Sequence, residues 1–392
     1  MFSFFKKTAV DLAIIDSLFP QANPWGFRNF EINGLLRALP DSVAFGMSVM
    51  YPDKKAWFSH GYGRTLNQFK RDRASYLTYY PQNKERVRYL PKRMQARLAY
   101  TYFLAETYTV LPYLERNKIP FVFVLYPGGA FGLNNTSSDA MLDAVLSSPY
   151  FKKVIVTQRV TRQYLLDKHQ CPLDKIHYEF GGYVQFFQQD VPPKRYYPSD
   201  KSTLDLCFVA AKYSPQGVDK GYDVFIALAK ALAMTYDFVR FHVVGNFTVD
   251  DVNVDGIADK IVFYGFKDAS FLKSFYPNMD ICLSPARPYQ LYPGNFDGFP
   301  LGADALCFGT VLMVTDALHN NDGFVDGEEL VMITPDVDDI LDKITPLIQD
   351  PPKMYALGRA GQAKLYTVMD PHRRLENIVA QLAEKETPCK NL

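Results

Sequence analysis

Short, mainly apolar runs alternate with amphipathic segments along most of the 392-residue chain. Leu12–Leu18, Pro120–Tyr126 and Ile281–Ser284 are such runs, and their length and composition are typical of strands buried on both faces of a parallel sheet. Between the runs, segments such as Tyr222–Met234 have helical spacing of apolar residues. The alternation predicts an α/β protein with helices covering parallel sheets.

The same criteria place the remaining elements. We expect further strands at Val43–Met50, Val154–Thr157, Ile176–Phe180, Leu206–Ala210, Phe241–Val244, Ile261–Tyr264, Val311–Val314 and Glu329–Ile333. We expect helices at Phe27–Leu39, Lys92–Arg116, Asp139–Leu146, Thr161–Lys168, Ser270–Phe275, Gly302–Phe308, Val337–Ile348, Pro352–Lys364 and Pro371–Glu384.

The chain is longer than a single hydrophobic core usually supports, so two domains are expected. Residues 188–203 are rich in proline and polar residues and have no period, which indicates a linker. We therefore predict two Rossmann-like doubly wound domains, residues 1–187 and 204–366. Ligands of such domains bind at the carboxyl ends of the strands, so a cleft between the two sheets is expected to hold the site.

Composition excludes several classes of function. A net charge of +1 argues against binding of nucleic acid. The five cysteines are scattered without zinc-like spacing, which favours a reduced, cytoplasmic protein. No apolar run is long enough to span a membrane. The aromatic and lysine residues of Met1–Lys7 suit peripheral contact with the inner face of a membrane, and a frayed terminus is the alternative.

The loop after the first strand of the second domain predicts an anion site. Lys212 and Lys220 flank a polar turn, and Gly221 opens a helix. Ammonium groups near exposed helix amides bind phosphates, although solvated lysines would give the same pattern. Gly245 and Gly265 each end a strand, where glycine lets a flat ring approach the backbone or simply makes a tight turn.

Two carboxylates flank a Gly/Pro-rich turn in the stretch "NFDGFPLGADALCFGTVLMVTD", residues 295–316. The amides of Leu301, Gly302 and Ala303 begin a short helix and would suit a diphosphate. Asp304 in the first turn could accept hydrogen bonds from ribose hydroxyls, and Asp297 could do so from a sugar. Helix capping and solubility are the alternative roles for the two carboxylates.

The order of these motifs resembles the C-terminal half of GT-B glycosyltransferases, in particular the retaining, family-4-like group. That family has a "GR…KG" loop, then "VGxG", "VxFxG", a "PS" strand end and "EGFGxxxxEAMAxGxPVV". The matching positions in this chain are Lys212, Lys220-Gly221, Gly245, Gly265, Ser284-Pro285 and "DGFPLGADALCFGTVLMVTD". The resemblance covers residues 150–385 well and residues 8–150 by topology only.

Several positions depart from the family pattern. Both glutamates of the last motif are aspartates, and Asp297 lies one residue closer to Asp304 than the family spacing. The Lys212–Lys220 loop is longer than usual. Tyr126-Pro127-Gly128-Gly129 stands where the family has a histidine, so the sugar of the donor is expected to be held differently.

The resemblance implies transfer of a hexosyl or related group from a nucleotide-diphosphate sugar, as in polysaccharide biosynthesis. The C-terminal domain would bind the nucleotide sugar, residues 1–187 would bind the acceptor, and a helix within 367–392 would cross back to the first domain. Lys212, Lys220 and Asp297 are the expected catalytic residues. The expected donor contacts are Gly245, Gly265, Phe266, Ser284, Leu301, Gly302, Ala303 and Asp304.

We expect no metal and no cofactor besides the donor substrate. Lysines and helix amides can stabilise the leaving diphosphate, and no Asp-x-Asp motif is placed to bring a divalent metal to it. In a retaining reaction the leaving phosphate can itself take the proton of the acceptor, so no protein base is assigned.

The acceptor, a glycan or a lipid-linked molecule, is expected at two loops of the first domain, residues 20–31 and 126–135. Gly26, Gly128 and Gly129 permit close backbone approach, and Arg28 could meet an anionic group. Trp25 and Phe131 could stack on a sugar, although Trp25 fits core packing equally well.

Other functions remain open at this point. A sugar-nucleotide epimerase would need clustered acid and base residues, and a phosphorylase would need a second phosphate site. The two Glu-to-Asp departures also allow a degenerate protein that binds a sugar nucleotide without turnover. A dehydrogenase is disfavoured because no G-x-G-x-x-G follows the first strand of either half. The sequence does not indicate the oligomeric state, the nucleotide base or the linkage.

Overall fold

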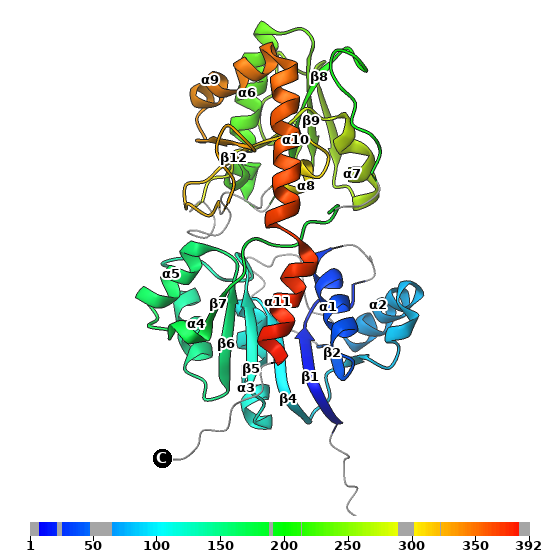
Figure 1. Ribbon diagram of the computed structural model, residues 1–392, viewed down its shortest axis with the longest axis vertical. Coiled ribbons are helices and arrows are strands. Elements are labelled where there is room, and N and C mark those ends of the chain that lie inside the picture. Colours follow the sequence, from blue (N-terminus) through cyan, green and yellow to red (C-terminus); the bar gives the residue numbers. More distant parts are fainter. Residues whose placement is uncertain are drawn as a thin grey trace, which may run out of the picture. The chain divides into compact units, whose positions relative to one another are not determined.

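The computed structural model describes residues 8–21, 26–47, 65–187, 191–212, 214–288, 302–321 and 323–383. The chain divides into two compact units (Figure 1). Unit 1 comprises residues 1–183 and 371–392, and unit 2 comprises residues 184–370. Each unit has a parallel sheet with helices on its faces, so the predicted pair of doubly wound α/β domains is confirmed. The predicted cleft concerns the relative placement of the units and stays a prediction.

The sheet of unit 1 has seven parallel strands in the order β3-β2-β1-β4-β5-β6-β7. The strands are β1 Thr8–Asp16, β2 Ser42–Gly46, β3 Val87–Tyr89, β4 Met94–Tyr102, β5 Phe121–Leu125, β6 Phe151–Val156 and β7 Ile176–Tyr178. The chain runs outward from β1 to β3 and then returns to the other side of β1 as β4. The direction of winding therefore reverses between β1 and β4, which is where ligands of doubly wound sheets bind.

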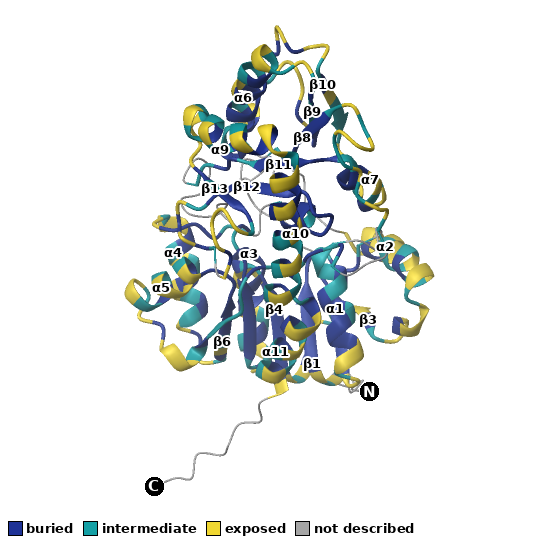
Figure 2. Cartoon of the chain, turned by 45° about the horizontal axis from the view of Figure 1, so that its top comes forward, coloured by how far each residue is buried: buried dark blue, intermediate teal, exposed yellow. Residues whose placement is uncertain are grey.

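Helices cover both faces of this sheet. One face carries α1 (Phe27–Ala38), α2 (Leu66–Tyr79) and α11 (Pro371–Ala383), and the other carries α3 (Leu104–Asn117), α4 (Thr136–Leu146) and α5 (Arg159–Asp167). Short 3₁₀ turns lie at Pro81–Asn83 and Leu173–Lys175. Alternate residues of β1 point to opposite cores, Leu12 and Ile14 to one and Ala13 and Ile15 to the other. The buried strands and the outward-facing exposed sides of the helices are visible in Figure 2.

The predicted helix Lys92–Arg116 is wrong in its first half. Residues Met94–Tyr102 form β4, which lies between β1 and β5, and α3 begins only at Leu104. The segment contains good helix formers, but burial of its second half between two strands outweighs their intrinsic preference. Phe103 separates the two elements with φ 57° and ψ 160°, a conformation that no helix continues through. The strand β3 and the helix α2 were not predicted.

The sheet of unit 2 has six parallel strands in the order β10-β9-β8-β11-β12-β13. The strands are β8 Leu204–Val209, β9 Val239–Val244, β10 Ile261–Gly265, β11 Ile281–Ser284, β12 Val311–Thr315 and β13 Val331–Ile333. The helices are η3 Pro215–Lys220, α6 Tyr222–Thr235, α7 Ala269–Phe275, η4 Tyr276–Asn278, α8 Ala303–Leu306, α9 Val337–Gln349 and α10 Pro351–Val368. The winding reverses between β8 and β11, which defines a second switch point.

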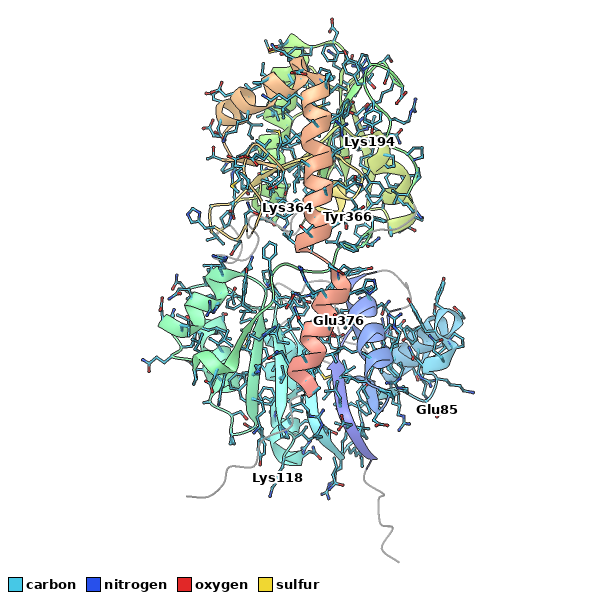
Figure 3. All side chains as sticks on the ribbon, in the orientation of Figure 1. Glu85, Lys118, Lys194, Lys364, Tyr366 and Glu376 are labelled. Carbon is cyan, nitrogen blue, oxygen red and sulfur yellow. The ribbon has the colours of Figure 1, made fainter. Side chains whose placement is uncertain are left out.

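The stretch predicted as a linker, 188–203, falls in unit 2 rather than between the units. Lys194 (Figure 3) is anchored there, because its Nζ donates to Thr310 Oγ1 at 2.9 Å and to the Met279 carbonyl. Burial lowers the pKa of Lys194 to about 8. Lys201 follows it and contacts Asp205 and Asp280, so this stretch packs as part of the second unit.

Two further expectations concern the membrane and the cysteines. None of the helices in the described ranges has both the length and the apolar character that spanning a bilayer requires. Cys171, Cys207, Cys282 and Cys307 are buried free thiols, and Cys389 lies outside the described residues. Met1–Lys7, the segment predicted to contact a membrane surface, also lies outside them.

Candidate functional site

The carboxyl edge of the unit 2 sheet carries three predicted site residues, the donor residues Gly245 and Gly265 and the catalytic residue Lys212. Gly245 follows β9, and its N–H donates to the carbonyl of Gly265, the last residue of β10, at 3.0 Å. Lys212 follows β8, and its N–H donates to Asn246 Oδ1 at 3.0 Å. Gly245 has φ 132°, and a Cβ there would lie 2.0 Å from the Ala210 carbonyl oxygen, so only glycine fits this close approach.

Lys220 lies at the switch point between β8 and β11. It ends the 3₁₀ helix η3, and Gly221 follows in the left-handed conformation, φ 72°. A Cβ on Gly221 would lie 2.0 Å from the carbonyl oxygen of Pro285, the residue after β11. The Arg287 N–H also donates to the Asp219 carbonyl at 3.0 Å. The loop that carries Lys220 is thus held against the end of β11, next to the predicted donor residue Ser284.

The ammonium group of Lys220 is buried beside a carboxylate. Its side chain is 7% exposed, and Nζ lies 3.8 Å from Asp219 Oδ2. Burial lowers the pKa of Lys220 to about 8, and the nearby Asp219 acts in the opposite direction. The Asp219 Oδ1 accepts a hydrogen bond from Ser214 Oγ. A buried ammonium held in one place is a cation that an anionic ligand at this edge could use.

Lys212 is more accessible and already has an ionic partner. Its Nζ lies 2.9 Å from both carboxylate oxygens of Asp251, and its side chain is 23% exposed. Burial opposes ionisation of Asp251, but the hydrogen bonds from Lys212 and the Thr248 N–H outweigh it and lower the pKa of Asp251. A diphosphate would therefore share Lys212 with Asp251, whereas Lys220 offers a more desolvated cation.

Phe266 projects from the same edge of the sheet. It follows Gly265 and is 77% exposed, an unusual exposure for a large aromatic ring. A Cβ on Gly265 would meet nothing within 4 Å, so this glycine allows a turn rather than a close contact within unit 2. An exposed ring at a strand end is available for stacking on a flat group.

Asp304 has a backbone partner in the structure. Its Oδ1 accepts a hydrogen bond from the Gln185 N–H at 2.9 Å. Burial raises the pKa of Asp304 to about 6, and the Gln185 N–H opposes this rise. Gly302 begins α8 with φ 77°, and Ala303 is its first residue, but α8 spans only four residues. The diphosphate role of these amides and the ribose role of Asp304 stay predictions.

Three predicted site residues lie outside the described residues. They are Trp25, Asp297 and Leu301.

In unit 1 the predicted acceptor residue Arg28 bridges two buried carboxylates at the switch point. Its Nε lies 2.8 Å from Asp16 Oδ2, and its Nη2 lies 3.1 Å from Glu106 Oε1. Asp16 ends β1, whereas Glu106 lies in the first turn of α3. Burial, reinforced by Asp16 and opposed by Arg28, raises the pKa of Glu106 to about 8. An anionic acceptor group would have to compete with these carboxylates for Arg28.

Gly129, one of the predicted acceptor residues, packs against Phe103. The Arg28 guanidinium lies 4.7 Å from the centre of the Phe103 ring. A Cβ on Gly129 would lie 2.5 Å from Phe103 Cβ, and the Gly129 carbonyl accepts a hydrogen bond from Ala105 N–H at 3.0 Å. Gly128 precedes it with φ 98°, and Gly26 caps α1 with φ 117°.

Phe131 was expected to stack on a sugar, and this expectation is wrong. Its side chain is fully buried in the core beneath α3, α4 and α5.

Sequence reasoning missed the carboxylates that surround the cations. Asp219 and Asp251 contact the two lysines, and Asp16 and Glu106 contact Arg28. Asp16 had a usable signal, since it ends an apolar strand at a carboxyl edge. The other three lie in loops or at a helix start with no distinguishing spacing. Within the described ranges, no group of three or more His, Cys, Asp or Glu side chains is placed to hold a metal ion.

Comparisons with known proteins agree with this geometry. Residues 204–350 match the family model described as Glycosyl transferases group 1. A sucrose-phosphate synthase from Thermosynechococcus elongatus has a similar structure, with TM-score 0.65 and 13% identity over 96% of this chain and 98% of its own. HepE of Anabaena in complex with UDP gives TM-score 0.63 and 13% identity over 95% and 99%. A trehalose-6-phosphate synthase gives TM-score 0.59 and 11% identity over 95% and 98%. A comparison with curated proteins finds no significant match.

Two parallel α/β units with these structural similarities define the GT-B fold. Residues 204–350 form a group 1 glycosyltransferase domain. The family resemblance predicted from the sequence is thus confirmed in the GT-B fold of the chain and in the group 1 glycosyltransferase match of residues 204–350.

Proposed function

We propose that this chain transfers a glycosyl group from a nucleoside-diphosphate sugar to a carbohydrate or glycolipid acceptor, with retention of configuration and without a metal ion. The diphosphate binds at the carboxyl edge of the unit 2 sheet. The first donor to test is a UDP-sugar, because structures of HepE, which share the fold at 13–14% identity, contain UDP and UDP-glucose.

The observation that carries the proposal is the buried Lys220 at the switch point between β8 and β11. Its position on a loop fixed against Pro285 holds the ammonium in place before the donor arrives. A preorganised cation in a poorly solvated site stabilises developing charge better than a mobile surface lysine.

The roles of the lysines follow from where negative charge develops during glycosyl transfer. The bond between the sugar C1 and the diphosphate oxygen breaks, and negative charge develops on the diphosphate. Lys220 and Lys212 stabilise this charge most when it is greatest, in the transition state. The acceptor oxygen bonds to C1 on the face that the leaving group vacates, and the acceptor proton passes to the leaving phosphate. Asp297 contacts the donor sugar, and Asp304 together with Gly245, Gly265, Phe266 and Ser284 lines the nucleotide.

The acceptor binds at the carboxyl edge of the unit 1 sheet. Gly26, Gly128 and Gly129 lie in the loops that follow β1 and β5 there. Arg28 lies at the same edge. We also assign stacking on the acceptor to Trp25, which lies outside the described residues. The carboxylates paired with Arg28 favour an acceptor that is neutral near this residue, and an anionic acceptor would have to displace one of them.

The test measures release of the nucleoside diphosphate. Purified protein is given a panel of nucleotide sugars with and without mono- and oligosaccharide or glycolipid acceptors, in EDTA and in added Mg²⁺ or Mn²⁺. We expect acceptor-dependent release that EDTA does not reduce, and an α-linked product from an α-linked donor. Interconversion of sugars without release would instead identify an epimerase. Donor-induced stabilisation of the fold without turnover would identify a non-catalytic binding protein.

A further inference from the structure

A pocket lies in unit 1, among residues that have no role in the proposed transfer. Its volume is about 440 Å³, within the range of small-molecule sites. The residues that line it are Met47, Tyr89, Leu90, Pro91, Lys92, Arg93, Tyr113 and Arg116. They come from the ends of β2 and β3, from the connection to β4 and from the last turns of α3.

The walls of this pocket are strongly basic. Three of its residues, Lys92, Arg93 and Arg116, carry positive charge, and none of its residues is acidic. All three cationic side chains are exposed. No carboxylate in the described part of the chain forms an ion pair with any of them. Three cations that lack an ion-pair partner among the described residues surround one hollow, and such a cluster gives a positive potential that attracts anions.

The floor of the pocket is apolar and aromatic. Leu90 and the Tyr113 ring pack partly against the core beneath α3, and Met47 belongs to that core. The Arg116 guanidinium lies 5.8 Å from the centre of the Tyr113 ring, which fixes one wall relative to the floor.

Tyr113 also supplies a polar group that has no partner. Its hydroxyl is buried and makes no hydrogen bond to any described residue. A buried hydroxyl without a partner costs free energy and calls for an explanation, such as a ligand that completes it. Burial raises the pKa of Tyr113 to about 12, so the hydroxyl keeps its proton and can donate to an anion.

We propose that this pocket binds a molecule that carries a phosphate or carboxylate group next to an apolar or ring-shaped part. The guanidinium groups of Arg93 and Arg116 and the Lys92 ammonium hold the anionic group, and the Tyr113 hydroxyl donates to it. The apolar part lies on Met47 and Leu90. A free anionic metabolite or sugar and an anionic lipid headgroup share this chemistry.

The test uses phenyl phosphate, which combines an aromatic ring with a phosphate, and phenol as its neutral counterpart. Binding to the full chain is measured by titration calorimetry at low salt. The double variant K92Q/R116Q should weaken phenyl phosphate binding by at least about ten-fold, because charge-assisted hydrogen bonds to phosphate are among the stronger polar contacts. Y113F should weaken it by about three-fold or more through loss of one donor.

The matched control is K70Q/R71Q, which removes one lysine and one arginine from the exposed side of α2, on the opposite face of the same sheet. Its affinity should equal that of the unaltered chain. Equal losses in both double variants, equal binding of phenol, or no binding of phenyl phosphate would overturn the proposal.

A second arm separates the two sources of the ligand. Flotation is measured with phosphatidylcholine vesicles, with and without phosphatidic acid. Phosphatidic acid-dependent flotation that K92Q/R116Q abolishes and K70Q/R71Q keeps would assign the site to a lipid headgroup. Phenyl phosphate binding without flotation would assign it to a soluble anion. Both arms measure binding, so their outcome does not depend on whether the chain has transferase activity.

Discussion

Replacing Lys220 with methionine should stabilise the fold while it weakens donor binding. The pKa of Lys220 falls from 10.5 to about 8, chiefly through burial. Each pKa unit corresponds to about 1.4 kcal/mol, so the charged lysine destabilises the folded state by up to about 3 kcal/mol. Methionine has a similar shape without the charge. Part of the gain is lost because Asp219 loses its cationic neighbour, so about 1–2 kcal/mol of net stabilisation is expected at pH 7.

The pH dependence of the free energy of unfolding independently tests whether charged Lys220 destabilises the fold. The folded pKa lies below the unfolded one, so between pH 8 and 10.5 the unfolded state binds more protons than the folded state. The cost of Lys220 is therefore complete at pH 7 and declines as the pH rises through this window, to about 1 kcal/mol or less at pH 10. The stability advantage of K220M should shrink accordingly in urea unfolding at pH 7 and pH 10.

Replacing Lys220 should weaken donor binding even though it stabilises the fold. The Lys220 ammonium is about 90% populated at pH 7 and about 10% populated at pH 9. The Kd of the unaltered chain for a nucleoside diphosphate should therefore rise about ten-fold between these values, and K220M should bind weakly at both. Lys230→Met, on the partly exposed side of α6, is the control and should change neither quantity. A K220M chain that unfolds at lower urea concentration and binds the diphosphate with unchanged affinity would refute the reasoning, because Lys220 would then be a structural residue.

Three further predictions concern stability. Because the pKa of Glu106 is raised, the folded state holds a proton that the unfolded state releases between about pH 4.5 and pH 8, so the free energy of unfolding falls as the pH rises through this range. Glu106→Gln should make this fall smaller in urea unfolding, and an unchanged slope would contradict the prediction. Gly221→Ala should destabilise unit 2 by about 1–3 kcal/mol and weaken donor binding, since the new Cβ would lie 2.0 Å from the Pro285 carbonyl oxygen. Thermal unfolding and diphosphate titration measure the two effects. Unchanged stability and affinity would contradict the prediction, because the loop would then accommodate the Cβ by a small shift. Arg374→Met should cost about 3 kcal/mol or more, because it removes a buried cation whose guanidinium donates to the Tyr126 hydroxyl and to the Glu179 carbonyl. Chemical denaturation measures this loss, and an unchanged free energy of unfolding would contradict the prediction.

The sequence predicted strands correctly where a strand is buried along its whole length. β5 and β12 are buried at every position, and both read as continuous apolar runs. β4 was missed because its first half carries Gln95 and Arg97, and Arg97 pairs with Asp11 on the neighbouring strand at 2.7 Å. A strand that is half exposed and then fully buried has no uniform period. The helix α2 was missed for a related reason, since only Phe69 and Tyr76 of its residues are buried.

The sequence predicted which residues lie at the site, but it did not predict which residues they contact. The alternation places Lys212, Gly245, Gly265 and Ser284 at one edge of one sheet, because parallel strands share their carboxyl ends. The residue after Lys220, Gly221, packs closely against Pro285, which lies 64 positions further along the chain, and no local sequence pattern predicts such a contact. The hydrogen bond between Asp304 and the Gln185 amide joins residues 119 positions apart, so its geometry was likewise beyond the sequence.

The chain of unit 1 is interrupted by the whole of unit 2, and this affects synthesis as well as stability. Helix α11 contributes Ile378 and Leu382 to the core of unit 1, and Arg374 bonds to Tyr126 and to the carbonyl of Glu179. During translation the first half of the protein therefore leaves the ribosome without its last core helix, whereas the inserted half emerges complete. The part that is made first is the part that finishes folding last, and ribosomes stalled before residue 371 would display an unfinished nascent domain.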